Sequence, residues 1–246
     1  MTTRKRVKSY SRLAVPRHQT ATERHCYIVA VIASSADLDA AMALQQPPDL
    51  FELRLDSLFP ITSRLEKKIF RLRAPLIITA RDPHEGGTGG LSFEKRCELL
   101  LRFLPRAKYI DVELHSARKF KSLLARARKH NIRWVFSYHD FKSTPTSRSL
   151  CAKARIARSL GADVFKVATR TDIPAAVARL IDFIVHKNID LPVSAMGIGR
   201  LGAISRLLLA RCGSVLNYAS VGRPKIEGQL PVDVLRLAIG ASRAMK

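Results

Sequence analysis

The stretch RWVFSYHDFKSTPTSRSLCAKARIARSLGADVFKVATR (133–170) contains the repeating unit of the fold. It begins with the short run RWVFSY (133–138) and ends with a second run, DVFKVA (163–168), and the segment between them is long enough to cross back over a sheet. Runs rich in Val, Phe and Tyr are typical of strands. Strands that alternate with longer amphipathic segments form parallel sheets covered by helices.

The same alternation extends in both directions along the chain. The intervening segments carry apolar residues at helical spacing, as in Leu99, Leu100 and Phe103, and a last helical segment covers 231–242. Eight units predict a single-domain (β/α)8 TIM barrel, with an open doubly wound sheet as the alternative. The other six strand runs are CYIVAVIA (26–33), LFELRL (50–55), PLIITA (75–80), YIDVEL (109–114), LPVSAM (191–196) and VLNYAS (215–220).

The composition fits one globular domain with a strongly basic surface. Of 246 residues, 47% are hydrophobic, and 43 Lys and Arg against 20 Asp and Glu give a net charge of +23. Such a charge attracts anionic ligands and binds nucleic acid non-specifically. No basic run interleaved with aromatics and no zinc-finger spacing is present, so no dedicated nucleic-acid partner is expected. We expect a basic, disordered tail over residues 1–24 and the barrel over 25–246.

Cysteine spacing and hydropathy exclude several other classes of protein. Cys26, Cys97, Cys151 and Cys212 lie far apart, without a CxxC pair for a metal or the density of a disulfide scaffold. No run of about 20 apolar residues could span a membrane, and residues 1–25 lack the apolar core of a secretory signal. A cytoplasmic protein with reduced thiols is expected.

Charged side chains lie in or directly after five of the expected strands, although strands of a parallel sheet are normally buried on both faces. In FELRLD (51–56), alternation places Glu52, Arg54 and Asp56 on one face. One such group would simply indicate an ion pair at a strand end. Five strands together indicate a site, because their ends meet at the C-terminal mouth of a barrel, where active sites lie. The residues are Glu52, Arg54, Arg81, Asp111, Glu113, His139 and Lys166.

Lys166 and His139 lie on neighbouring strands and could react together. Burial of Lys166 between Phe165 and Val167 disfavours the ammonium form and would leave an amine able to attack a carbonyl. The alternative is a stem lying along apolar surface with its charged head in water. His139 can take and return a proton, and Glu85 could orient it or be an ordinary loop carboxylate. The other six histidines, His115 among them, are expected to have surface roles.

A glycine motif in the seventh unit points away from dinucleotide binding. Gly197-Ile198-Gly199-Arg200-Leu201-Gly202 matches GxGxxG between a strand and a helix. No acidic residue follows about 20 positions later to hold a ribose hydroxyl, so NAD binding is set aside. Backbone N–H groups before the helix could still face an anion, and Arg206 could hold a carboxylate through two hydrogen bonds.

Together these residues resemble the type I 3-dehydroquinate dehydratases, which are Schiff-base enzymes of the shikimate pathway. The resemblance extends from about Cys26 to the end of the chain and depends on the order and spacing of short motifs. These motifs are ELRLD (52–56), TAR and EGG (79–81, 85–87), YIDVEL (109–114), SYHDF (137–141), DVFKVAT (163–169), Met196-Gly197 with Ser205-Arg206, and Gly228-Gln229.

The resemblance implies dehydration of 3-dehydroquinate to 3-dehydroshikimate in the biosynthesis of chorismate and the aromatic amino acids. It assigns catalysis to Lys166, which would form an imine with the C3 ketone, and to His139 with Glu85, which would move the C2 proton. No metal or organic cofactor would be needed, because the lysine is the electron sink, and a homodimer is implied. Substrate contacts would come from Glu52, Arg54, Arg81, Arg206, Gln229, Met196 and Tyr218.

One loop departs from the family pattern. Lys225-Ile226-Glu227 stands before Gly228-Gln229 where the family usually has Ser-Ala-Pro, so the loop over the substrate is expected to pack or pair differently. Two other functions stay open at this point. A class I aldolase-type lyase would share the barrel and the lysine, and a non-catalytic barrel could bind anions or nucleic acid.

Overall fold

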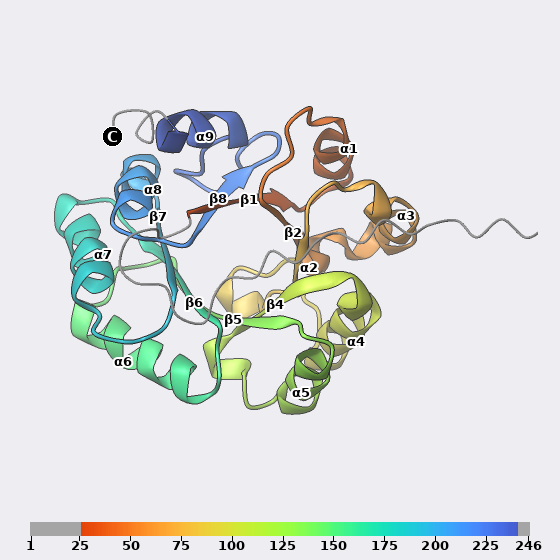
Figure 1. Cartoon of the computed structure of the whole chain (residues 1–246), viewed down its shortest axis with the longest axis horizontal. Helices are drawn as coiled ribbons and strands as arrows, with labels where there is room; N and C mark the ends of the chain where they lie inside the picture. The colour runs from red at the N-terminus through yellow and green to blue at the C-terminus, as the bar shows by residue number, and fades with distance from the viewer. Residues whose placement is uncertain (1–25, 241–246) are drawn as a thin grey trace, which may run out of the picture.

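The computed structural model describes residues 26–240, and the expected tail over 1–24 lies outside them. All eight predicted strands are present close to their predicted bounds, and they form the centre of the molecule in Figure 1. The strands are β1 Tyr27–Ile32, β2 Leu50–Arg54, β3 Leu76–Thr79, β4 Ala107–Glu113, β5 Arg133–Asp140, β6 Val164–Arg170, β7 Val193–Ile198 and β8 Leu216–Ser220.

The strands form one parallel sheet that curls into a barrel. Their order is β7-β6-β5-β4-β3-β2-β1-β8, so β1 pairs with β2 on one side and with β8 on the other. Between β7 and β8 the barrel is closed by a few bonds: Val215 N donates to Val193 O at 2.9 Å, and the hydroxyl of Ser194 donates to Leu216 O. The (β/α)8 barrel is therefore confirmed over the open sheet.

Helices surround the strands, as Figure 1 shows, and their apolar faces have the predicted spacing. Leu99, Leu100 and Phe103 are buried against the sheet, and Ser92 caps the same helix by accepting from Lys95 N. Within residues 26–240 the α-helices are α1 Ser35–Ala43, α2 Leu55–Leu58, α3 Thr62–Lys68, α4 Phe93–Phe103, α5 Lys121–Lys129, α6 Ser147–Ser159, α7 Pro174–His186, α8 Gly202–Arg211 and α9 Val232–Gly240. The 3-10 helices are η1 Phe59–Ile61, η2 Ile69–Arg71, η3 Pro83–Glu85, η4 Leu104–Arg106 and η5 Leu114–Ser116.

The side chains of each strand divide between two cores. One core lies between the sheet and the helices and takes Phe165 and Val167 of β6. The other fills the inside of the barrel and takes Val164 and Ala168, so Lys166, on the same face, points inward. Apolar residues from seven strands fill the N-terminal end of the barrel: Val29, Leu50, Ile77, Tyr109, Val135, Val164 and Leu216.

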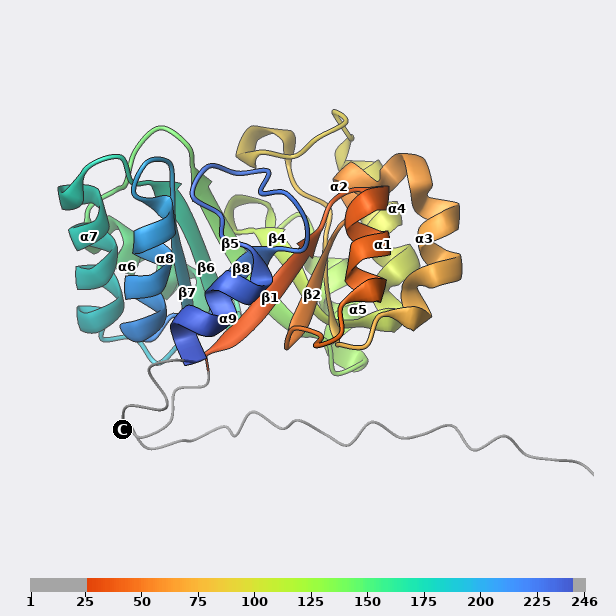
Figure 2. The same cartoon turned by 90° about the horizontal axis from the view of Figure 1, so that it is seen from above.

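The C-terminal ends of the strands carry the loops that cover the site. Figure 2 shows the β3–α4 loop and the β8–α9 loop rising from the same end of the barrel. Among residues 26–240, no helix has the length and apolar character needed to cross a membrane. Apolar side chains fill the N-terminal end of the barrel and the two loops rise from its C-terminal end. The polar residues predicted from the sequence therefore lie between this apolar core and the two loops.

Candidate active site

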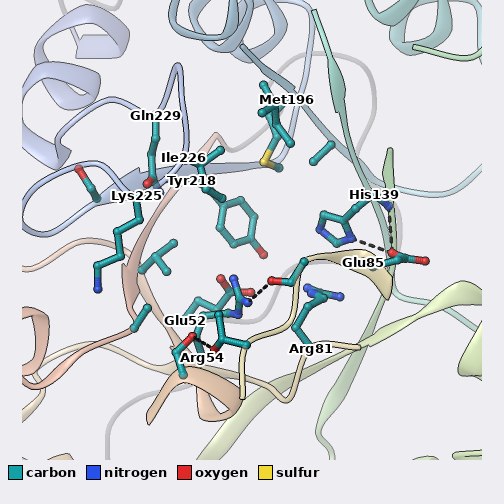
Figure 3. A pocket seen from close by; sticks show the side chains of 18 of the residues that line it. Glu52, Arg54, Arg81, Glu85, His139, Met196, Tyr218, Lys225, Ile226 and Gln229 are labelled. Atoms are coloured by element: carbon teal, nitrogen blue, oxygen red, sulfur yellow. Dashed lines mark hydrogen bonds and ion pairs between the residues drawn. The ribbon is translucent and has the colours of Figure 1, made fainter. Parts of the chain in front are cut away.

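All ten predicted site residues line one cavity at the C-terminal mouth of the barrel, with a volume of about 240 Å³. Figure 3 shows side chains from opposite walls, such as Tyr218 and His139, facing the same space. The ten residues are Glu52, Arg54, Arg81, Glu85, His139, Lys166, Met196, Arg206, Tyr218 and Gln229.

Lys166 is buried inside the barrel between two carboxylates. Its Nζ lies 2.9 Å from Asp111 Oδ2 and 3.2 Å from Glu52 Oε1, and 4.0 Å from the centre of the Tyr218 ring. This geometry excludes the alternative of a lysine that reaches water. The two carboxylates hold the amine in place inside the barrel.

Arg81 organises the carboxylates beneath the cavity. It donates to Asp111 at 3.0 Å, to Glu113 at 3.0 Å and to the Ser137 hydroxyl at 2.6 Å. Burial alone would lower the pKa of Arg81, but Asp111 and Glu113 hold it well above its usual range. Burial would likewise raise the pKa of Asp111, yet Arg81 and Lys166 hold it far below its usual range. Asp111 is therefore a permanent anion beside the lysine amine.

His139 and Glu85 form a hydrogen-bonded pair on the side of the cavity across from Tyr218 (Figure 3). His139 Nδ1 lies 2.8 Å from Glu85 Oε2, which also accepts the His139 backbone N–H at 3.0 Å. A carboxylate partner fixes Nδ1 as the protonated nitrogen, so Nε2 keeps its lone pair. Burial, with the cations of Arg81 and Lys166, lowers the pKa of His139 well below its usual value. His139 is therefore a neutral imidazole able to accept a proton.

The strand pairing brings the lysine and the histidine to adjacent positions. In the parallel register of β5 and β6, Lys166 pairs with Ser137 and His139 pairs with Ala168, so the histidine lies one inward-facing position closer to the mouth. Tyr138 faces outward, where Lys153 of α6 stacks on its ring at 4.2 Å, as the alternation predicts. The Glu85 loop turns back at Gly86, whose φ of +84° suits glycine.

Arg206 is a buried cation without a carboxylate partner among residues 26–240. It donates to Tyr218 O at 2.9 Å, and its Nε has no partner within the described chain. Burial lowers the pKa of Arg206 to about 10. The Tyr218 and Ser220 hydroxyls are also buried without a partner in this part of the chain, and both line the cavity. A polar anionic ligand would satisfy all three groups.

The position of Asp56 differs from the expectation that it shares one strand face with Glu52 and Arg54. Strand β2 ends at Arg54 and α2 begins at Leu55, so the alternation stops before Asp56, which is not among the cavity-lining residues. Its carboxylate instead accepts from Arg54 Nε at 3.1 Å and from Arg81 N at 3.1 Å. Asp56 therefore supports two predicted site residues from outside the cavity.

The β8–α9 loop covers the cavity and is anchored on both flanks. Lys225 forms an ion pair with Asp37 of α1, and Glu227 lies 3.2 Å from Arg170 of β6. Two of the three residues that depart from the family pattern, Lys225 and Glu227, thus form ion pairs with residues outside the loop. A Cβ on Gly228 would lie 2.5 Å from the Cα of Gly202, so glycines of the GxGxxG pattern serve close loop packing.

Sequence reasoning left several contributing residues out of the site. Alternation predicts an inward charge at Asp111 but does not predict its ion pair with Lys166. Asp37 and Lys225 could not be paired because they lie far apart in the chain. His115, expected to be a surface residue, lies 2.9 Å from Glu85. The available signal was the alternation in YIDVEL (109–114), which places Asp111 and Glu113 on one face.

Comparison with known proteins agrees with this geometry. The family model described as Type I 3-dehydroquinase matches residues 25–245. The chain is 33% identical to 3-dehydroquinate dehydratase from Methanothermobacter thermautotrophicus, over 82% of this chain and 88% of that protein. It is also 33% identical to the protein of that name from Shouchella clausii, over 81% and 82%. The crystal structure of 3-dehydroquinate dehydratase from Geobacillus kaustophilus, 26% identical, superposes with a TM-score of 0.81 over 89% of this chain and 92% of that one. The chain therefore belongs to the type I 3-dehydroquinase family.

Proposed function

We propose that Lys166 and His139 dehydrate 3-dehydroquinate to 3-dehydroshikimate by way of an imine. The observation that carries the proposal is the pairing of a buried amine with a neutral imidazole on the adjacent strand, both lining one cavity. The enzyme class, a Schiff-base hydro-lyase of aromatic amino-acid biosynthesis, follows from family membership. What the site adds is a role for each side chain.

The reaction begins at Lys166. Its neutral amine attacks the C3 carbonyl, and the resulting carbinolamine takes up one proton and loses one water to give a protonated imine. Asp111, 2.9 Å from Nζ, stabilises that cation, while His139 takes the proton that the ammonium releases before attack and returns it to the departing hydroxyl. The imine withdraws electrons from the neighbouring C2–H bond, so a weakly acidic proton can be removed near neutral pH.

His139 moves the proton in the next two steps. Its Nε2 takes the C2 proton to give an enamine, while Glu85 stabilises the imidazolium through Nδ1. The enamine then expels the C1 hydroxyl, which takes the proton from Nε2 and leaves as water. A second water hydrolyses the remaining imine and frees 3-dehydroshikimate and Lys166. The balance over the cycle is the loss of one water from the substrate.

The remaining predicted residues bind the substrate. Arg206 holds the carboxylate, since it is a buried cation whose Nε lacks a partner within residues 26–240. Glu52, Arg54 and Arg81 approach the ring hydroxyls from the lower wall. Gln229 closes the cavity from the β8–α9 loop, and Met196 and Tyr218 also line the cavity.

Borohydride trapping tests the imine. With 3-dehydroquinate present, reduction should inactivate the enzyme and attach the ligand mass to the peptide that contains Lys166. Lys166→Ala should abolish both trapping and formation of the conjugated enone product. Lys153→Ala, which removes a half-buried lysine of α6 that does not line the cavity, is the matched control and should trap normally. An adduct on another lysine, or normal turnover by Lys166→Ala, would refute the mechanism. Smaller carbon fragments in place of the enone would indicate an aldolase-type lyase instead.

The proposal also covers the oligomeric state of the enzyme, its cellular location and its binding partners. A homodimer is supported by exposed apolar side chains on the neighbouring helices α8 and α9, including Leu208 and Leu237. Light scattering of the purified protein tests it. The cytoplasmic location and the lack of a dedicated nucleic-acid partner stay predictions, to be checked by cell fractionation and by a DNA-binding titration at physiological salt.

A further inference from the structure

The Glu85 carboxylate is held between two histidines. Its Oε2 accepts from His139 Nδ1 at 2.8 Å and from the His139 backbone N–H at 3.0 Å. Its Oε1 lies 2.9 Å from His115 Nδ1, and within residues 26–240 this is the hydrogen bond that Oε1 makes. Both oxygens of the carboxylate are thus fixed, each by a different imidazole.

His115 lies outside the cavity. It belongs to η5, which follows β4 directly, and it is not among the residues that line the cavity. Its side chain is 51% exposed, whereas the side chains of His139 and Glu85 are 9% and 10% exposed. Its Nε2 lies 3.6 Å from Asp82 Oδ2, an oxygen that also accepts from Arg96. The ring is therefore held by its hydrogen bond to Glu85, while one face stays in water.

The hydrogen bond from His115 matters because Glu85 is buried, and burial disfavours the charged form of its carboxylate. Burial raises the pKa of Glu85, and Glu113 adds to the rise, while Arg81 and His115 oppose it. A carboxylate with only one oxygen bonded could also rotate about its last bond. A donor on Oε1 restricts that rotation and compensates part of the desolvation.

We propose that His115 is a positioning residue for the dehydration, which holds Glu85 ionised and turned toward His139 through an Nδ1–H···Oε1 hydrogen bond. The inference rests on the roles proposed above for His139 and Glu85. Loss of the bond loosens the group that orients the general base, and it leaves the substrate contacts intact. The turnover number therefore falls while KM stays unchanged.

Two substitutions of His115 separate the hydrogen bond from simple occupancy. His115→Phe keeps a ring of similar size and removes the donor. His115→Asn places its amide N–H₂ close to the position of the imidazole Nδ1 and keeps the donor. We expect kcat to fall about tenfold in His115→Phe and to recover to within about threefold in His115→Asn, the usual scale for partners that orient a functional side chain. KM should change less than about twofold in both.

A matched control is available on α7. His186 Nδ1 lies 2.9 Å from Asp182, so it makes the same kind of histidine–carboxylate bond at an exposed site away from the cavity. His186→Phe should leave kcat and KM unchanged. Thermal melting of each variant shows whether the fold is intact. A loss of kcat in His115→Phe supports the proposal only if the melting midpoint of that variant is unchanged. If His115→Phe unfolds, the kcat of His115→Asn is compared with that of the wild type instead.

A double substitution shows whether His115 acts through Glu85. In an E85Q background, H115F should cause no further loss, because the group that it positions has already lost its charge. An equal loss in H115F and H115N, full activity in H115F, or an additive loss in the double variant would each overturn the proposal. Normal kcat in E85Q alone would overturn the role of Glu85 and with it that of His115. Trapping at Lys166 would then still test the imine separately.

Discussion

We expect Arg206 to lower the free energy of unfolding and to strengthen substrate binding. Replacement of Arg206 by methionine measures both effects. Burial lowers the pKa of its guanidinium to about 10, a lowering that corresponds to a cost of about 3 kcal/mol for the charged form at neutral pH. The single hydrogen bond to Tyr218 O returns about 1 kcal/mol. Arg206→Met should therefore raise the free energy of unfolding by about 1–3 kcal/mol.

The sign of this effect fixes its pH dependence. The folded-state pKa of Arg206 lies below the unfolded one, so its burial cost is fully present at neutral pH and begins to decrease only as the pH rises above about 10. The stability difference between Arg206→Met and the wild type should be constant between about pH 6 and pH 8. Urea unfolding followed by circular dichroism measures it.

Substrate binding should change in the opposite direction. Removing one partner of a buried ion pair costs about 2–5 kcal/mol, so kcat/KM should fall at least about 30-fold, mainly through KM. Arg211→Met is the matched control, because Arg211 lies on the same helix, is exposed and donates to Ala238 O at 3.0 Å. It should leave KM unchanged. A destabilised Arg206→Met, or one with a normal KM, would refute the reasoning.

Two other predictions concern the general base and the loop. Since burial and the cations of Arg81 and Lys166 depress the pKa of His139, protonation should abolish kcat/KM only well below pH 6.5, and Lys166→Met should move the His139 NMR titration to higher pH. A titration unchanged in that variant would contradict the electrostatic coupling. Because the Lys225–Asp37 ion pair is partly exposed, Lys225→Ala should raise KM less than about fivefold, and high salt should have a similar effect on the wild type. Lys95→Ala, which breaks an exposed pair with Glu98, should not change KM, and a salt-independent loss in Lys225→Ala would exclude the ion pair as its cause.

The barrel could be predicted because each strand has a recognisable local sequence pattern. The runs are short and rich in β-branched residues, most of the segments between them have apolar residues at helical spacing, and the strand ends in the structure differ from the predicted ends by at most two residues. The alternation of inward and outward side chains fails at Asp56, because the chain turns directly before this residue. The backbone leaves the strand after Arg54 to begin α2, and alternation then no longer predicts the direction of Asp56.

The site could be predicted only in part, because much of it depends on contacts between distant segments. Inward-facing charges such as Lys166 and Asp111 follow from alternation within a strand, and their convergence follows from the barrel. The partner of Lys225 does not, since Asp37 comes from the first helix. The same holds for His115, whose closeness to Glu85 depends on how two loops fold over the barrel mouth.

The pairing of β1 with both β2 and β8 has a consequence for biosynthesis on the ribosome. The first strand to emerge keeps one edge without a neighbour until the last strand has been synthesised. Exposed strand edges invite aggregation, so the nascent chain benefits from chaperone protection during this period. Tyr218 and Gln229 are translated after all the other side chains of the site. A nascent chain that ends between Lys166 and Tyr218 therefore lacks the β8 wall of the cavity.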